Sequence, residues 1–259
     1  MRHRLFSLAI GVLAAALFGT PASAQNTNVG EVSLLFVSPN PDLRLQSGAL
    51  TTATGITEVD FVEEFGIEDK TFPEIRLALG RKHKFRFGYL PVRYDADAII
   101  QRTITFRGQT FTVGAPATTE IKWDIFRFGY QWDFVSMDRG FVGVVGELKY
   151  NHLDASIDSP ALARAATTEQ KAPVPTVGVA GRGYLHPMVS VGAEFTGLKW
   201  DRSDFEATFL DFDLNGAVTF GRYIGVSGGY RSVTVDYFID DDVGDLQLKG
   251  PYIGVIAKF

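Results

Sequence analysis

The sequence predicts an all-β fold: a transmembrane, antiparallel, up-and-down β-barrel of about ten strands. Three observations indicate this class. The chain begins with a segment typical of a secretory signal peptide. No later segment has the run of about 18 apolar residues that a membrane helix needs. Polar and apolar residues instead alternate over runs of about 8–10 residues, as in strands that cross a membrane.

Residues 1–24 are the predicted signal peptide. Arg2 and Arg4 form a basic start, residues 5–18 are apolar, and Ala22-Ser23-Ala24 matches a cleavage site with small residues. The apolar run is shorter than the roughly 20 residues that span a bilayer, so an N-terminal anchor helix is the weaker alternative. The predicted domains are the signal peptide over 1–24 and a single barrel over 25–259.

The composition excludes several other classes. The chain has no cysteine, which excludes disulfides and cysteine-ligated metal or iron–sulfur sites. A net charge of −5 argues against a nucleic-acid partner, which would call for a basic surface. Aromatic residues make up 13% of the chain, and we expect many of them on a face that contacts lipid.

The clearest strand pattern covers residues 126–134, where every even position is aromatic and the odd positions are Arg127, Gly129, Gln131 and Asp133. Similar alternation predicts strands over 30–47, 72–80, 84–97, 118–135, 141–154, 174–185, 188–200, 205–220, 223–239 and 246–259. Pro39 and Pro41 indicate a break in the first strand. Residues 101–113 predict a hairpin that extends beyond the membrane. Eight or twelve strands remain as alternatives.

The predicted connections are of two kinds, as in outer-membrane barrels, where short turns lie on one side and long loops on the other. Short turns are expected at 80–83, 136–140, 186–188 and 221–222, and longer loops near 49–71, 97–117, 155–173, 200–204 and 240–245. We expect residues 156–171 to form a mobile loop or a short helix.

Two of the loops are acidic. Residues 55–71 have a local charge of −5 with interleaved apolar residues, which predicts a segment folded over the barrel mouth. Its acids form either a solvated lid or a cation-binding surface. Residues 240–245 are an acidic turn without the ligand spacing of an EF-hand.

The C-terminus carries the sharpest motif. The chain ends with Phe259, preceded at alternate positions by Ala257, Val255 and Ile253, all apolar. This ending resembles the C-terminal insertion signal of bacterial outer-membrane β-barrels, and the pattern of the whole mature chain resembles their small porin-superfamily, OmpA-like and OmpW-like members. The resemblance implies an outer-membrane location, contact with lipid, and recognition by the barrel-assembly machinery. The alternative is a secreted β-sandwich or lipocalin-like barrel, which would need its apolar face inward.

If the aromatic faces point to lipid, the opposite positions point into the lumen. These positions are charged and nearly balanced in sign, and unpaired charges in a narrow interior are costly, so they predict an ion-paired network. The predicted network comprises Glu74, Arg76, Arg86, Arg127, Glu147, Lys149, Arg182, Glu194, Asp211, Asp213 and Arg231.

The predicted function is that of a monomeric, non-enzymatic barrel with a plugged lumen, no cofactor and no metal, whose role lies in envelope structure or surface interaction. A barrel of this size is nearly filled by its side chains, whereas open channels need about sixteen strands. A narrow channel for small solutes is the first alternative. A hydrolase at the rim is the second, based on His152 with Asp154, Asp240 and Asp241, although His152 falls on the outward face and no G-x-S-x-G motif is present. His83 and His186 lie in predicted short turns.

Overall fold

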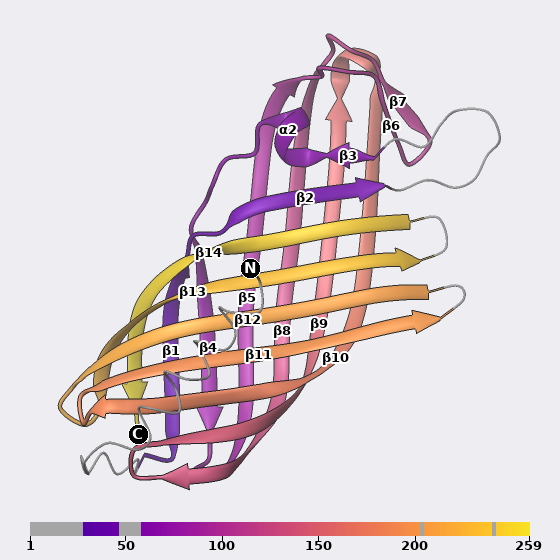
Figure 1. Ribbon diagram of the computed structural model, residues 1–259. Coiled ribbons are helices and arrows are strands. Elements are labelled where there is room, and N and C mark those ends of the chain that lie inside the picture. Colours follow the sequence, from indigo (N-terminus) through magenta and orange to yellow (C-terminus); the bar gives the residue numbers. More distant parts are fainter. Residues whose placement is uncertain (1–27, 47–57, 203–204, 240–241) are drawn as a thin grey trace, which may run out of the picture.

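The computed structural model describes residues 28–46, 58–202, 205–239 and 242–259. These residues form a closed antiparallel β-barrel in which consecutive strands are neighbours and β14 returns to pair with β1 (Figure 1). Within the described residues, no helix is long and apolar enough to cross a membrane. The predicted signal peptide lies outside the described residues.

Ten strands form the closed ring, which confirms the predicted fold class and strand number. They are β1 (Gly30–Val37), β4 (Phe72–Leu79), β5 (His83–Ile99), β8 (Pro116–Met137), β9 (Gly140–Ser159), β10 (Arg164–His186), β11 (Val189–Arg202), β12 (Phe205–Phe220), β13 (Ile224–Ile239) and β14 (Asp242–Lys258). The four predicted short turns lie together at one end of the barrel, which we call the turn end. In Figure 1, β5, β8, β9 and β10 extend farther from this end than β11–β14 do.

The first predicted strand is broken where its prolines indicated. β1 ends at Val37, and β2 (Asn40–Gln46) continues along β14 after the break. Among the described residues, the other edge of β2 pairs only with the short β3 (Val59–Asp60). The break passes very close to β14, because a Cβ at Gly250 would lie 2.1 Å from the carbonyl oxygen of Ser38. Only glycine at position 250 allows this approach.

The prediction of a loop or short helix over 156–171 was wrong. β9 continues to Ser159, and a single 3-10 turn, η1 (Pro160–Leu162), leads into β10 at Arg164. Inward Ala155 and Ile157 continue the alternation of β9 with small or branched side chains, so the pattern is present but faint. The predicted hairpin within residues 101–113 is present in shorter form, as β6 (Ile104–Phe106) and β7 (Gln109–Phe111).

Partway along the long strands, the apolar residues change from the outward face to the inward face, and the polar residues change in the opposite sense. On β8, the outward side chains from Phe126 to Phe134 are aromatic, whereas those from Thr118 to Asp124 are polar. The inward side chains change in the opposite sense at the same level, from Arg127 and other polar groups to buried apolar groups. Outward aromatic residues extend over about the 9–11 residues that a membrane strand needs.

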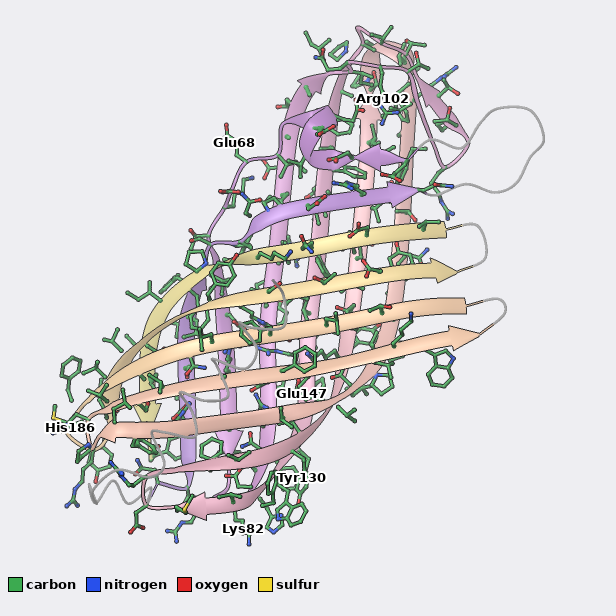
Figure 2. All side chains as sticks on the ribbon, viewed as in Figure 1. Glu68, Lys82, Arg102, Tyr130, Glu147 and His186 are labelled. Carbon is green, nitrogen blue, oxygen red and sulfur yellow. The ribbon has the colours of Figure 1, made fainter. Side chains whose placement is uncertain are left out.

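A row of neighbouring aromatic rings marks the level of this exchange. Tyr89 and Phe126 lie 4.6 Å apart between ring centroids, and Tyr150 follows Phe126 at 6.5 Å. We call these three residues the girdle, the barrel on its turn side the membrane half, and the barrel beyond it the outer half. Figure 2 labels Tyr130 in the membrane half, and Glu68 and Arg102 at the far end of the outer half.

The outer half contains a continuous apolar core. It includes Trp123, Phe209 and Tyr94, each about 1% exposed. Burial raises the pKa of the Tyr94 hydroxyl, which therefore stays protonated. Large inward side chains of this kind fill the bore as they would fill the core of a soluble β-protein.

The acidic segment folds over the mouth, as predicted. Its helix α2 (Phe61–Phe65) begins at Asp60, whose Oδ1 accepts the amide N–H groups of Val62 and Glu63 at 3.0 Å. Phe61 packs edge-on against Phe106 of the β6–β7 hairpin, at 5.9 Å between centroids. The helix thus joins its apolar face to the core of the outer half.

The chain ends in the seam that closes the barrel. The Phe259 amide donates to the Gly30 carbonyl at 2.9 Å, and the amides of Val29 and Gly30 donate to the Phe259 carbonyl. The side chains of the predicted insertion signal, Ile253, Val255, Ala257 and Phe259, all lie on the outward face.

Deleting Phe259 is therefore expected to lower the amount of barrel inserted in the outer membrane, because it removes both the terminal aromatic side chain and the end of the seam. Membrane fractionation with immunoblotting measures this amount, and Phe259→Tyr, which keeps an aromatic ring, is the matched control. Normal levels of the deletion variant would contradict an insertion role for this residue.

Candidate functional site

The candidate site is the charged interior of the membrane half. The inward faces of eight strands hold the predicted network residues there. These are Glu74 and Arg76 on β4, Arg86 on β5, Arg127 on β8, Glu147 and Lys149 on β9, Arg182 on β10, Glu194 on β11, Asp211 and Asp213 on β12, and Arg231 on β13. All of them except Arg182 form an ion pair with another member of this set.

Glu74 is the centre of the network and is fully buried. Its Oε2 lies 2.8 Å from Nη2 of Arg76, and its Oε1 lies 2.8 Å from Nη1 of Arg231. Arg127 also donates to Oε1. Three guanidinium groups therefore converge on one carboxylate, an arrangement that is stable only while the negative charge is present.

Asp211 is a second acidic centre. Its Oδ2 lies 2.7 Å from Nη2 of Arg231 and 2.6 Å from Nζ of Lys149. Lys149 is fully buried and also donates to Thr196 Oγ1 at 2.7 Å. Because Arg231 pairs with both Glu74 and Asp211, the two acidic centres form one network.

The network spans the bore rather than following the wall. Arg76 on β4 reaches Asp213 on β12 at 2.7 Å, and Arg86 on β5 reaches Glu194 on β11 at 2.6 Å. Neither pair of strands is adjacent in the barrel. The side chains of opposite walls therefore meet across the lumen at this level.

Glycine on the inner wall makes room for the long side chains. A Cβ at Gly129 would lie 2.6 Å from Cγ of Glu147, and one at Gly88 would lie 2.9 Å from Nε of Arg127. Both distances are shorter than a Cβ atom normally makes, so a larger residue at either position would force the Glu147 or Arg127 side chain to move.

The structure adds four charged residues that the sequence reasoning did not single out. Arg182 pairs with Glu31 on β1 through Nη1 at 2.8 Å and Nη2 at 3.0 Å. Lys84 pairs with Asp133 at 2.6 Å, and Lys258 lies near the turn end with Nζ 3.4 Å from Thr219 Oγ1. Alternation with the outward residues Phe85, Phe134 and Phe259 was the signal that could have identified Lys84, Asp133 and Lys258.

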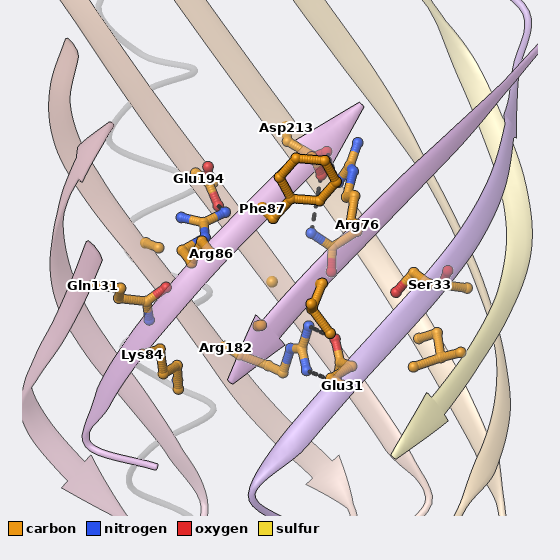
Figure 3. Close-up of a pocket in the computed structure, with 18 of the residues that line it drawn as sticks. Glu31, Ser33, Arg76, Lys84, Arg86, Phe87, Gln131, Arg182, Glu194 and Asp213 are labelled. Atoms are coloured by element: carbon orange, nitrogen blue, oxygen red, sulfur yellow. Dashed lines mark hydrogen bonds and ion pairs between the residues drawn. The ribbon is translucent and has the colours of Figure 1, made fainter. Parts of the chain in front are cut away.

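A cavity of about 150 Å³ lies between the network and the turn end. Figure 3 shows its wall, with Arg182 directed at Glu31 and Arg86 directed at Glu194. Arg76 lines the cavity on the side of the network. The cavity therefore ends at the network, and the apolar core of the outer half lies beyond it.

The second candidate site, at His152, lies outside the lumen. His152 is on the outward face of β9, two residues beyond Tyr150 of the girdle, as predicted. Its Nε2 lies 3.1 Å from Oε1 of Glu169 and 3.4 Å from Oδ2 of Asp154. Hydrogen bonds from Lys171 and then His152 lower the pKa of the Glu169 carboxyl. The acidic residues Asp240 and Asp241 lie outside the described residues.

No model of a known protein family matches the chain, and no curated protein matches it. Solved structures do. The outer-membrane protease OmpT from Escherichia coli superposes with a TM-score of 0.60 and 8% identity, over 93% of this chain and 99% of OmpT.

Two further structures are more distant. The translocator domain of the autotransporter NalP from Neisseria meningitidis gives a TM-score of 0.43 at 12% identity, over 100% of this chain and 96% of that domain. The attachment invasion locus protein Ail of Yersinia pestis gives 0.37 at 10% identity, over 89% and 99%. At 8% identity the likeness to OmpT concerns the fold alone, and that fold is the one of a bacterial outer-membrane β-barrel.

Proposed function

We propose that this protein is a non-enzymatic barrel of the bacterial outer membrane with a closed lumen, which serves envelope structure or surface interaction through its outer half. One observation carries the proposal: side chains fill the bore at two successive levels along the barrel axis. The ion-paired network crosses it in the membrane half, and the apolar core with α2 fills it in the outer half.

The orientation follows from the connections. Outer-membrane barrels place short turns in the periplasm and long loops outside the cell. The turn end and its cavity accordingly face the periplasm, and α2 with the β6–β7 hairpin faces the exterior. The polar outward face of the outer half, which includes Lys122 and Asp124, suits water rather than lipid.

Purified protein in planar bilayers is expected to show no single-channel steps, because two filled levels in series separate the cavity from the outer end. Current recording at high salt concentration measures this directly, and unheated SDS gels verify that the inserted protein is folded. Reproducible conductance steps would favour the narrow channel, the alternative that the cavity at the turn end supports.

A hydrolase at the rim has weaker support. His152 contacts two carboxylates, but it lies on the outward face, apart from the cavity. In nucleophilic catalysis, histidine activates a nucleophile within hydrogen-bond reach, and the partners found for His152 in the described part of the chain are the acids Asp154 and Glu169. A histidine between two carboxylates has no hydroxyl or thiol nucleophile to activate.

A further inference from the structure

Three potential metal ligands converge on the outward face of β9 and β10, just beyond the girdle. His152 and Asp154 lie two residues apart on the same face of β9, and Glu169 on β10 is directly opposite Asp154. The imidazole nitrogen and one oxygen of each carboxylate all lie within 4.8 Å of one another. Strand pairing therefore brings the groups together, and a rigid β-ladder holds them in place.

The distances match those in a coordination shell. Zn²⁺ binds imidazole nitrogen and carboxylate oxygen at about 2.0–2.2 Å, so neighbouring ligand atoms in a tetrahedral shell lie about 3.3–3.6 Å apart. Nε2 of His152 lies 3.4 Å from the Asp154 oxygen and 3.1 Å from the Glu169 oxygen. An ion placed among the three groups would need only small side-chain movements.

We propose that His152, Asp154 and Glu169 form a binding site for a divalent transition metal of the Zn²⁺ class. One imidazole with two carboxylates is a ligand set that such metals accept, whereas Ca²⁺ and Mg²⁺ prefer oxygen ligands alone. Three protein ligands leave a coordination position for water. The bound ion would join β9 to β10 on the outer side of the membrane.

The neighbouring charges leave the site accessible. On the neighbouring strand β8, Lys122 lies opposite Asp154 and Asp124 lies opposite His152. Each forms an ion pair with another residue, Lys122 with Glu120 at 2.8 Å and Asp124 with Arg93 at 2.7 Å. Lys171 is the one direct competitor among the described residues, because its ammonium group pairs with the same Oε1 of Glu169 that contacts His152. Half of its side chain is exposed, so it can turn to solvent when a metal binds.

The competing lysine makes the proposal specific. If Glu169 is a ligand, Lys171→Met frees its oxygen and is expected to tighten metal binding several-fold. If the cluster is only a surface ion-pair network, the same substitution has no such effect.

The test is calorimetric titration of ZnCl₂ into the folded, detergent-solubilised full-length protein after chelator treatment. We expect saturation at one Zn²⁺ per chain, no displacement by excess Ca²⁺, and a loss of affinity of at least about tenfold in His152→Ala, since even outer-shell changes cost 10–100-fold. His186→Ala is the matched control, because His186 is an exposed imidazole at the turn end, and it should bind as the wild type does.

Heat-dependent migration on SDS gels verifies that each variant is folded. The proposal is overturned if the wild type shows no saturable Zn²⁺ binding at micromolar concentrations, or if His152→Ala and His186→Ala bind equally well. Unchanged or weaker binding by Lys171→Met would exclude Glu169 as a ligand and overturn the three-ligand site.

Discussion

Replacing Glu74 by alanine is expected to lower the free energy of unfolding by about 3–5 kcal/mol, the range measured when one partner of a buried ion pair is removed. The carboxylate compensates Arg76, Arg127 and Arg231 at once. Without it, three guanidinium groups face one another in the narrow bore, and Asp211 and Asp213 compensate them only in part. The barrel is then destabilised from its centre.

Denaturant unfolding in detergent micelles, followed by tryptophan fluorescence, measures this loss. Asp95→Ala provides the control, because Asp95 is 77% exposed and pairs with Lys70 at the surface. Exposed pairs contribute at most about 1 kcal/mol. A Glu74→Ala variant that is no less stable than Asp95→Ala would show that the network does not stabilise the fold.

The second large effect tests the membrane boundary at the girdle, where the outward face of the strands changes from aromatic to polar. Val144→Arg is expected to cost about 2–4 kcal/mol, since Val144 lies on the outward face of β9 about midway between the turn end and the girdle, where a cation would meet the middle of the lipid-facing wall. Ser156→Arg makes the same change of charge on the same outward face of β9, but in the outer half. It is expected to cost less than about 0.5 kcal/mol, as surface substitutions usually do.

Folding of the two variants into lipid vesicles, measured as the fraction of heat-modifiable protein across a denaturant series, gives both costs in one experiment. The difference between Val144→Arg and Ser156→Arg is the informative quantity, because strand, face and introduced group are shared. Equal costs at the two positions would place the membrane boundary elsewhere than at Tyr150.

Much of this architecture could be predicted because strands have a period of two, which is legible without any knowledge of pairing partners. The same alternation selected the inward residues Glu74, Arg127 and Asp211. It could not predict which residues pair, since Arg231 and Glu74 are 157 positions apart and meet only through the tilt and closure of the barrel. The inward position of Glu31 was not predicted, because the start of its strand, β1, has no aromatic residue that marks the outward face.

The exchange of faces was also missed. The expectation of an aromatic face toward lipid and a polar face inward holds for the membrane half alone. In the outer half, Leu153, Ala155 and Ile157 point inward, the arrangement that would have favoured a soluble barrel. The alternation is the same in both halves, so periodicity alone does not reveal which face is buried. The extension of β9 and β10 beyond the girdle was missed because the alternation over residues 155–173 involves small side chains and is therefore weak.

The two halves on either side of the girdle also differ in how unfolding changes the surroundings of their apolar side chains. Apolar side chains released from the outer half enter water, so their exposure adds a large positive heat-capacity change. In the membrane half, the outward apolar side chains already contact lipid or detergent, and unfolding changes their surroundings much less. The outer half therefore supplies most of the curvature in the temperature dependence of stability, and cooling weakens it first.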